Sequence, residues 1–287
     1  MKNILIIGGG GYIGSVLSNF LSENTDFDIT SIDINHSYKY NRINYINDKY
    51  DNLNVEFYNK FTDIILLAGH SSISNSKDLL NVIDNNVRNF AWLLEIINDN
   101  QKLIYASSSS IYGFNNTETS EEFTNYNPIT YYDLCKYIID NIAKLSNKHY
   151  YGLRFGSVNG FSDNLRTDIM INSMIYNGKL NNKFVIKNKD TYRPILGIND
   201  LCNVFLTIIN NENKELSGIY NINSFNSSVI EIADKIKEIT NINYELIEDD
   251  NVFYDFKISS KKFISNFNFT FKDTLETIII ELNNKII

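Results

Sequence analysis

Runs of consecutive apolar residues, each about as long as a β-strand, alternate with helix-length stretches along the first half of the chain. The apolar runs lie at residues 3–7, 28–32, 63–68, 102–107 and 150–155. The helix-length stretches lie near residues 13–23, 76–98 and 131–147. Because the apolar runs are continuous and do not alternate with polar positions, they indicate strands covered on both faces. The pattern therefore predicts a doubly wound α/β domain built on a parallel sheet.

The pattern changes after Phe155. A helix-like stretch and short strand candidates are followed by two more helical stretches, at 163–178, 183–187, 218–222, 228–240 and 271–285. We therefore expect two domains, with residues 1–156 forming the doubly wound domain and residues 157–287 a smaller, mixed α/β domain. The segment around 194–213 is expected to pack back on the first domain.

The composition indicates a folded globular protein and narrows the classes of partner. Of the 287 residues, 43% are hydrophobic and 13% aromatic, which leaves little room for general disorder. Lys and Arg total 26 against 34 acidic residues, a net charge of −8 without the basic stripe that nucleic-acid binding requires. No apolar stretch approaches the roughly 18 residues of a membrane span. We expect no nucleic-acid partner, no membrane anchor and no signal peptide.

Cysteine and histidine are too sparse to indicate a metal centre. Cys135 and Cys202 stand far apart and lack histidines at ligand spacing, which favours a reducing compartment without disulfides or zinc. His70 and His149 belong to no motif and are expected in structural or surface positions. We therefore expect a cytoplasmic protein that holds no metal.

A glycine cluster, in the segment IIGGGGYIGSVL, closes the first strand and opens the first helix. Gly8, Gly11 and Gly14 have the spacing of a dinucleotide-binding turn, which lets a pyrophosphate and the helix approach the backbone closely. Asp33 ends the second strand, where a carboxylate binds both ribose hydroxyls and repels a 2′-phosphate. The pattern predicts NAD in preference to NADP. An ordinary aspartate in a strand-ending turn is the alternative for Asp33.

Tyr132 and Lys136 stand four residues apart and so lie on one face of the third predicted helix. A nearby ammonium group stabilises a phenolate, so this pair suits acid–base chemistry. Chance spacing on an amphipathic helix is the alternative. The serine run in YASSSSIYG follows the fourth predicted strand, at the sheet edge where doubly wound folds bind ligands. A hydroxyl there can hydrogen-bond the substrate oxygen that the tyrosine deprotonates.

Together these segments resemble the extended short-chain dehydrogenases that act on nucleotide sugars, the NAD-dependent epimerase/dehydratase group. The resemblance covers essentially the whole chain and rests on eight features in order: GGGGYIG, YIND, LLAG, NNVRNFAWLLE, YASSSSIYG, the Tyr132–Lys136 pair, LRFGSVNG and RPILGINDL. It implies a Rossmann-like sheet, NAD as cofactor and a nucleotide-diphosphate sugar as substrate. It also implies a homodimer formed by the helices near 76–98 and 131–147.

The resemblance also assigns roles to single residues. Ser108, Tyr132 and Lys136 are the implied catalytic residues: the tyrosine takes a proton from the sugar, and the lysine lowers its pKa and binds the nicotinamide ribose. The implied cofactor positions are Gly8, Gly11, Tyr12, Ile13, Gly14, Asp33, Asp48, Leu67, Ala68, Gly69, Asn86, Ser107, Tyr132, Lys136, Phe155 and Val158. The implied substrate positions are Ser108, Ser157, Arg166, Asn172 and Arg193.

Several positions depart from the family pattern or stay open. Arg193 is expected to contact the diphosphate, whereas an exposed or ion-paired structural role is equally open for Arg166. Ser157 and Asn159 stand where the family usually has Asn and Tyr, which leaves the sugar and the nucleotide open. Cys135 replaces a usual Ser and is expected to pack.

The serine run also bears on the reaction. Ser109 and Ser110 occupy positions where 4,6-dehydratases of the family carry Asp and Glu, and a hydroxyl cannot replace a carboxylate base near neutral pH. Dehydration is therefore disfavoured, and hydride chemistry at a sugar carbon, most often C4, is left. We expect an NAD-dependent C4 epimerase. A 4-ketoreductase or 4-dehydrogenase, and a cofactor-binding protein without activity, are the alternatives.

Overall fold

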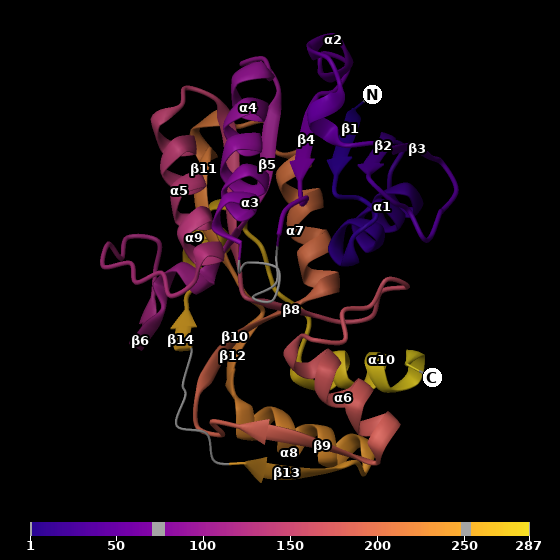
Figure 1. Ribbon diagram of the computed structural model, residues 1–287, viewed down its shortest axis with the longest axis vertical. Helices are drawn as coiled ribbons and strands as arrows, with labels where there is room; N and C mark the ends of the chain where they lie inside the picture. The colour runs from indigo at the N-terminus through magenta and orange to yellow at the C-terminus, as the bar shows by residue number, and fades with distance from the viewer. Residues whose placement is uncertain (1, 71–77, 248–253, 287) are drawn as a thin grey trace.

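The computed structural model describes residues 2–70, 78–247 and 254–286, and a seven-stranded sheet is its largest element (Figure 1). The strand order is β11-β7-β5-β4-β1-β2-β3, and every neighbouring pair is parallel. The strands are β1 (Asn3–Ile7), β2 (Asp28–Asp33), β3 (Ile43–Asn47), β4 (Asp63–Leu66), β5 (Lys102–Ser108), β7 (His149–Phe155) and β11 (Gly218–Ile222). The predicted doubly wound α/β sheet is confirmed, and its order changes direction between β1 and β4, where such folds bind ligands.

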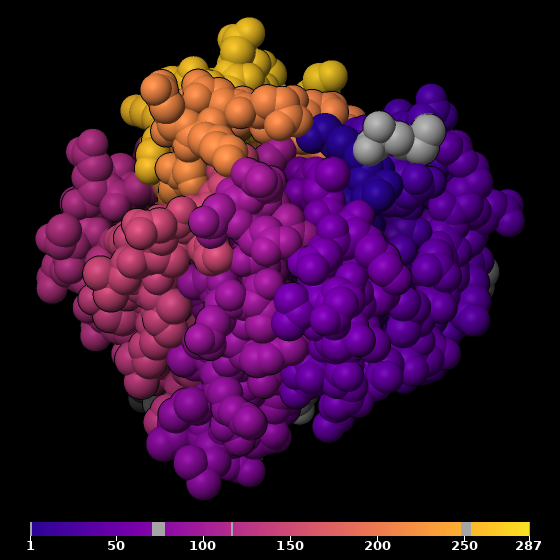
Figure 2. Space-filling model, turned by 90° about the horizontal axis from the view of Figure 1, so that it is seen from above, coloured from indigo at the N-terminus to yellow at the C-terminus, as the bar shows by residue number. Residues whose placement is uncertain are grey.

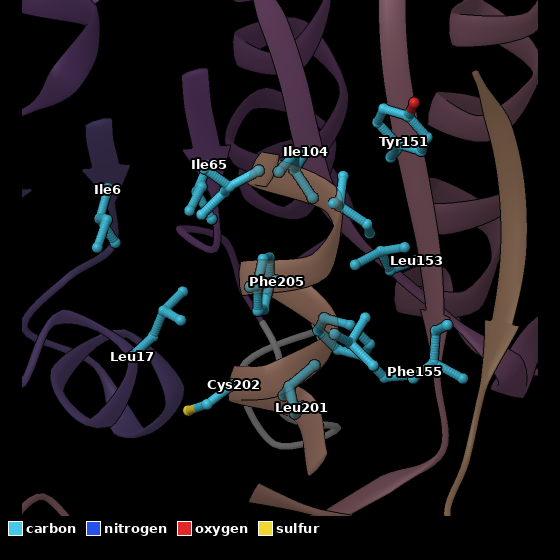
Figure 3. Close-up of a cluster of buried hydrophobic side chains, with 14 of the residues drawn as sticks. Ile6, Leu17, Ile65, Ile104, Tyr151, Leu153, Phe155, Leu201, Cys202 and Phe205 are labelled. Atoms are coloured by element: carbon cyan, nitrogen blue, oxygen red, sulfur yellow. The ribbon is translucent and has the colours of Figure 1, made fainter. Parts of the chain in front are cut away.

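Helices cover both faces of this sheet. The principal ones are α1 (Tyr12–Asn24), α4 (Asn89–Ile96), α5 (Tyr131–Leu145) and α7 (Ile198–Asn210). Alternate residues of the strands face opposite layers: Ile6 packs with α1 and α7, whereas Leu5 packs with α4 and α5. Figure 3 shows the first of these layers, in which Leu17 and Phe205 face the strands. Burial of each such side chain stabilises the fold by about 2 kcal/mol.

The helix that precedes β5 contains an irregular turn. Residues 79–96 form one continuous helix made of α3 (Leu79–Ile83), the π-helical turn η3 (Asp84–Arg88) and α4. Single π-turns inside α-helices are rare and frequently accompany functional sites.

A smaller lobe lies at the carboxyl edge of the large sheet (Figure 1). It contains the sheet β12-β10-β8 and the strand pair β13-β9, and the helices of the lobe pack with these strands around one apolar cluster. Its elements are β8 (Ser157–Asn159), α6 (Met170–Asn181), β9 (Lys183–Lys187), β10 (Tyr192–Gly197), β12 (Phe225–Ser228), α8 (Val229–Thr240), β13 (Asn243–Ile247) and α10 (Leu275–Lys285). The remaining elements are η1 (Tyr50–Asn52), α2 (Val55–Tyr58), η4 (Ser109–Tyr112), β6 (Phe114–Thr119), η5 (Lys214–Leu216), β14 (Asp255–Ile258) and α9 (Lys261–Phe267).

Two strands of the large sheet differ from the sequence-based expectation. The run at 218–222 was assigned to the smaller domain, and this is wrong because β11 pairs with β7 as an edge strand of the large sheet. Strand β3 was not expected, because its residues are half exposed and polar and lack a continuous apolar run. Helix α7, within the segment 194–213, packs on the large sheet.

The amino edge of the large sheet, opposite the smaller lobe, is held together by a buried lysine. Lys102 donates hydrogen bonds from its Nζ to the carbonyl oxygens of Ile208, Ile209 and Asn211 at the end of α7 and pairs with Asp63 at 3.1 Å. Figure 2 shows this end of the molecule, where the indigo N-terminal segment meets orange residues. None of the helices in the described ranges combines the length and the apolar character that a membrane span needs.

Candidate active site

The glycine-rich turn connects the end of β1 to the start of α1. Gly8 has φ +89°, and a Cβ at this position would lie 2.5 Å from the backbone nitrogen of Ala68. A Cβ at Gly14 would lie 2.1 Å from the carbonyl oxygen of Gly8. Both positions therefore require glycine, since neighbouring backbone occupies the space of a side chain.

The start of α1 presents free N–H groups on the open side of this turn. Gly11 is the N-cap of the helix, and no side chain caps the first turn. A Cβ on Gly11 would meet only the Gly8 carbonyl oxygen, at 3.3 Å. Uncapped N–H groups at the positive end of a helix dipole bind phosphates, so this turn fits the pyrophosphate of a dinucleotide such as NAD.

Asp33 and Asp48 lie side by side at the ends of β2 and β3. The Asp33 carboxylate accepts a hydrogen bond from the Gly10 N–H at 3.0 Å, and the Asp48 N–H donates to the Asp33 carbonyl oxygen at 3.0 Å. The Asp48 carboxylate accepts hydrogen bonds from the Lys49 N–H and the Asn52 side chain, both at 2.7 Å. A carboxylate has about four acceptor positions, so Asp33 retains capacity for the two hydroxyls of a ribose.

Tyr12 and Asn172 join the smaller lobe to the turn. The Tyr12 hydroxyl donates to the Gly160 carbonyl oxygen at 2.8 Å and accepts a hydrogen bond from the Asn172 amide at 3.1 Å. Burial raises the pKa of Tyr12 well above its usual range. The fully buried Asn172 amide also accepts the Gly160 N–H at 3.0 Å and donates to the Arg166 carbonyl oxygen at 3.2 Å. These contacts engage the Tyr12 hydroxyl and the Asn172 amide within the protein. Tyr12 keeps its backbone N–H in the first turn of α1 for the cofactor role that the sequence predicts.

Asn86 shapes the loop that follows β4. Its amide accepts the His70 N–H at 2.8 Å and donates to the His70 carbonyl oxygen at 3.2 Å, from within the π-turn η3. Gly69 has φ +152°, and a Cβ there would lie 2.5 Å from the Asn86 oxygen. Leu67 and Ala68 are held by the Ile7 carbonyl oxygen. The Asn86 amide thus supports the loop backbone beside the predicted cofactor site.

The four serines that follow Ala106 have different environments. The buried Ser107 hydroxyl makes no hydrogen bond within the described part of the chain, as expected for a group that a ligand or water satisfies. The Ser109 hydroxyl donates to the Phe155 carbonyl oxygen at 2.7 Å. Ser108 and Ser110 contact each other, with their hydroxyl oxygens 2.7 Å apart.

Tyr132 and Lys136 face this serine segment from α5. The Lys136 Nζ donates to the Ala106 carbonyl oxygen at 2.6 Å and lies 5.6 Å from the centre of the Tyr132 ring. Burial raises the pKa of Tyr132 to about 12, although a hydrogen bond with Ser108 opposes this shift. Burial lowers the pKa of Lys136 to about 8, against the attraction of the Asp140 charge. The structure therefore brings Ser108, Tyr132 and Lys136 together at the carboxyl end of β5.

These two pKa values modify the expectation that Lys136 activates Tyr132 by lowering its pKa. Lys136 loses its proton well before Tyr132 in the ligand-free protein, so the lysine alone does not activate the tyrosine. A further positive charge that acts on the tyrosine is needed, and the nicotinamide ring of an oxidised cofactor carries one.

Two further residues at the site, Asp133 and Tyr254, were not found from the sequence. Asp133 is fully buried and its carboxylate accepts hydrogen bonds from the Ser110 hydroxyl at 2.5 Å and the Tyr254 hydroxyl at 2.7 Å. Asp133 also forms a capping box with Thr130 at the start of α5. The T-x-x-D spacing signals the helix start, but nothing local in the sequence signals the contact with Ser110.

Of the residues predicted to bind substrate, Arg193 lies beside Tyr254, with the guanidinium 5.6 Å from the centre of the ring and a hydrogen bond to the Tyr254 carbonyl oxygen. Burial lowers the pKa of Arg193. Arg166 forms a half-exposed ion pair with Asp168 at 2.6 Å, yet its charge acts on Tyr132. Ser157 lies on β8, opposite Ile195 of β10.

The apolar residues predicted to line the cofactor pack in the core, and Asn159 makes a buried hydrogen bond. Phe155 and Val158 are buried in the cluster that contains α1 and α7, and Ile13 packs against the same cluster. Asn159, which stands where the resemblance predicts Tyr, is fully buried. Its side chain accepts the Ile171 N–H at 3.0 Å and so stabilises the start of α6. In the described residues, no group of three His, Cys, Asp or Glu side chains is arranged to hold a metal ion.

The family model described as "NAD dependent epimerase/dehydratase family" matches residues 4–223. Two curated relatives cover most of the chain at low identity. An ADP-L-glycero-D-manno-heptose-6-epimerase of Brachyspira hyodysenteriae is 28% identical and is covered to 80%, with 82% of this chain matched. A UDP-glucose 4-epimerase of Mycoplasma genitalium is 27% identical and is covered to 84%, with 85% of this chain matched.

The fold is similar to that of solved structures in the same group. The UDP-glucuronic acid 4-epimerase of Bacillus cereus, in complex with UDP-glucuronic acid and NAD, superposes with a TM-score of 0.86 at 18% identity. The match covers 99% of this chain and 98% of that one. At this identity the likeness concerns the fold.

Proposed function

Because the chain belongs to the NAD dependent epimerase/dehydratase family, we propose that it is an NAD-dependent nucleotide-sugar epimerase that inverts C4 through a 4-keto intermediate. One observation carries the proposal. Ser108, Tyr132 and Lys136 meet at the carboxyl end of β5, and the same sheet edge holds the glycine turn that fits a pyrophosphate.

The chain supplies the acid–base part of this reaction. NAD, when bound, supplies the hydride acceptor and a positive charge beside the tyrosine. The Tyr132 phenolate takes the proton of the sugar hydroxyl and returns it after the sugar has turned over. Lys136 is held against the Ala106 carbonyl oxygen at 2.6 Å, and its ammonium group would also bind the nicotinamide ribose. Ser108 contacts the Tyr132 hydroxyl from the end of β5.

The contacts of the serine segment argue against dehydration. Ser109 is bound to the Phe155 carbonyl oxygen and Ser110 to Asp133. Neither hydroxyl can serve as the carboxylate base that removal of water needs near neutral pH. Redox-neutral chemistry at one carbon is therefore favoured.

The contacts between the lobes support a retained cofactor. The Asn164 side chain donates to the Gly10 carbonyl oxygen at 2.8 Å, and the Ser162 hydroxyl donates to the Tyr12 carbonyl oxygen at 3.1 Å. These bonds fasten the smaller lobe to the dinucleotide turn, so a cofactor there exchanges only when they open. An epimerase regenerates its NAD in each cycle, whereas a ketoreductase must exchange it.

Arg193 is the proposed anchor of the substrate's diphosphate. Arg193 is partly buried, and its guanidinium lies 5.6 Å from the centre of the Tyr254 ring, whose hydroxyl donates to Asp133. Arginine binds diphosphates in a planar, bidentate geometry that suits recognition in an otherwise acidic protein. The substrate class that follows is a nucleotide-diphosphate sugar.

We also infer a homodimer and a cytoplasmic location. Large apolar side chains stay exposed on the helices expected to pair, among them Leu80 (75% exposed), Tyr131 (45%) and Leu134 (40%). Both cysteines are free and buried, which suits a reducing compartment. Light scattering tests the dimer, and a monomeric mass would reject it.

The test of the function is incubation of the purified protein with UDP-, GDP-, CDP-, dTDP- and ADP-linked sugars without added cofactor. We expect inversion at C4 by NMR, no net formation of NADH, and release of NAD on denaturation. Tyr132→Phe should abolish inversion, and Tyr131→Phe, a change at the adjacent exposed tyrosine, should leave it intact. Activity that requires added NAD(P)H and a 4-keto sugar would replace the epimerase with a ketoreductase, and inversion at C6 would overturn the C4 assignment alone.

A further inference from the structure

A chain of hydrogen bonds connects the catalytic serine to a buried carboxylate. Ser108 Oγ lies 2.7 Å from Ser110 Oγ, which lies 2.5 Å from Asp133 Oδ1. We propose that Asp133 is a positioning residue that fixes the direction of this chain, so that Ser108 donates to Ser110 and meets Tyr132 and the sugar only as an acceptor. The part that concerns the sugar rests on the proposed function, whereas the direction of the chain does not.

Asp133 is surrounded by donors. Its Oδ2 accepts hydrogen bonds from the N–H groups of Ile129 at 3.1 Å and Thr130 at 2.9 Å, and from the Tyr254 hydroxyl at 2.7 Å. Its Oδ1 faces the Ser110 hydroxyl. Three donors converge on Oδ2, which suits a carboxylate, and a carboxylate only accepts hydrogen bonds. Ser110 must therefore donate to Asp133.

The direction of the next bond follows from the number of hydrogens. A hydroxyl has one donor and two acceptor positions. Because the hydrogen of Ser110 points to Asp133, the bond between the two serines uses the hydrogen of Ser108. Ser108 also accepts the backbone N–H of Ser110 at 3.2 Å. One acceptor position of Ser108 is left, and a hydroxyl of Tyr132 or of the sugar can fill it.

This direction has a consequence for a C4 epimerase. The single hydrogen on O4 is the one that the Tyr132 phenolate takes, so it cannot also be donated to Ser108. An acceptor likewise offers nothing to the ketone, whose oxygen has no hydrogen. The ketone must leave its contacts and turn over before the hydride returns, and with this direction of the chain Ser108 does not hold it back.

The hydrogen bond with Ser108 favours ionisation of Tyr132 when Ser108 donates it, and the direction of the chain withholds that hydrogen. A phenolate is an acceptor, so Ser108 can donate to it only by turning away from Ser110. Other charged groups also act on Tyr132. They are Lys136 and Asp133 on its own helix and Arg166 in the segment before α6. Tyr254, from the segment before β14, donates to Asp133 and lies beside Arg193. Replacement of Ser110 changes none of these charges.

The main test is Ser110→Ala, read by ultraviolet absorbance of tyrosinate during a pH titration of the NAD-bound protein, with Tyr132→Phe as the subtracted reference. Loss of the Ser110 hydroxyl frees the Ser108 hydrogen to donate to the phenolate, and a hydrogen bond to a charged group lowers the pKa of Tyr132 by about one unit. Ser110→Thr restores the hydroxyl and should titrate like wild type. Ser109→Ala, whose partner is the Phe155 carbonyl oxygen, should also leave the titration unchanged. A wild-type titration in Ser110→Ala would overturn the proposal.

Asp133→Asn gives a second, independent reading. Ile129, Thr130 and Tyr254 all donate, so the amide oxygen must face them and the amide NH2 must face Ser110. The chain then runs in reverse and ends on Tyr132, and one negative charge is lost, so the pKa of Tyr132 should fall further than in Ser110→Ala. An unchanged or raised value would overturn the proposal even if Ser110→Ala failed to fold. The titration needs no sugar, so a negative epimerase assay with a shifted titration rejects only the proposed function.

Discussion

Gly14 and Gly11 lie in the same turn, yet the structure predicts different defects when each is replaced by alanine. A Cβ on Gly14 would lie 2.1 Å from the Gly8 carbonyl oxygen and 2.7 Å from the Gly9 Cα, both in the backbone. An ordinary contact needs about 3.4 Å, so α1 must move away from the turn by roughly 1.3 Å. Such overpacking costs about 1–3 kcal/mol, and a chain of this size should melt about 3–9 °C lower.

The same displacement also weakens NAD binding. The N–H groups of the first helical turn would move out of hydrogen-bond range of the pyrophosphate, and each bond to a charged group contributes about 1.5–3 kcal/mol. Loss of two such bonds by Gly14→Ala predicts roughly 100-fold weaker binding or worse. Gly11→Ala adds a Cβ that meets only the Gly8 oxygen at 3.3 Å. We expect the pyrophosphate on this open side of the turn. Gly11→Ala should weaken NAD binding while the ligand-free protein melts within about 2 °C of wild type.

Thermal melting without ligand and titration calorimetry with NAD separate the two effects. Gly14→Ala should fail in both measurements and Gly11→Ala only in the second. An unchanged melting temperature for Gly14→Ala would refute the account of helix–strand packing. A large loss of stability in Gly11→Ala would refute the assignment of its open side to the ligand.

Three further predictions follow from single residues. Asp33→Ser removes the charge that repels a 2′-phosphate, so the ratio of NADP to NAD affinity should rise at least tenfold by calorimetry; an unchanged ratio would remove Asp33 from the specificity assignment. Lys136→Met should abolish activity but raise the melting temperature of the ligand-free protein at pH 7. The pKa of the buried ammonium is about 8 in place of 10.5, so its charge destabilises the fold below pH 8, and this destabilisation disappears as the pH rises from 8 to 10.5. A lower melting temperature would contradict this reasoning. Burial lowers the pKa of His149 from 6.5 to about 4, so the free energy of unfolding should fall by up to about 3 kcal/mol as pH is lowered through that window, and urea denaturation of His149→Gln should show a flatter dependence.

The sequence was most informative where the chain is buried on both faces. Three strands of the large sheet, β1, β4 and β5, contain continuous apolar runs, and a run of this kind has few other ways to bury itself. Strand β3 escaped prediction because an edge strand mixes polar and apolar residues. Strand β11 was found as a strand but assigned to the wrong sheet, because only long-range packing decides which sheet edge a short run joins.

The site divides in a similar way. Glycine spacing and the Tyr132–Lys136 spacing are local patterns, and the structure brings those residues to one sheet edge. The contacts of Tyr12 and Asn172 with Gly160 were not foreseen, because Gly160 is distant from Tyr12 along the chain and no spacing rule connects them. Asp133 was passed over for the same reason, since its contact with Ser110 exists only after α5 has packed on β5.

The proton affinities at the site explain why the cofactor must come first. In the ligand-free protein the pKa of Tyr132 is about 12 and that of Lys136 about 8, so near neutral pH the phenol keeps its proton and the lysine is charged. Burial raises the first and lowers the second, and each shift opposes ionisation of the site. A bound nicotinamide cation favours the phenolate and disfavours the ammonium, so it lowers both pKa values. It can make Tyr132 lose its proton before Lys136 only if it lies nearer to Tyr132 than to Lys136. In the proposed reaction the tyrosine is therefore a base only in the cofactor complex, and a sugar that binds before NAD would meet a phenol that cannot take its proton.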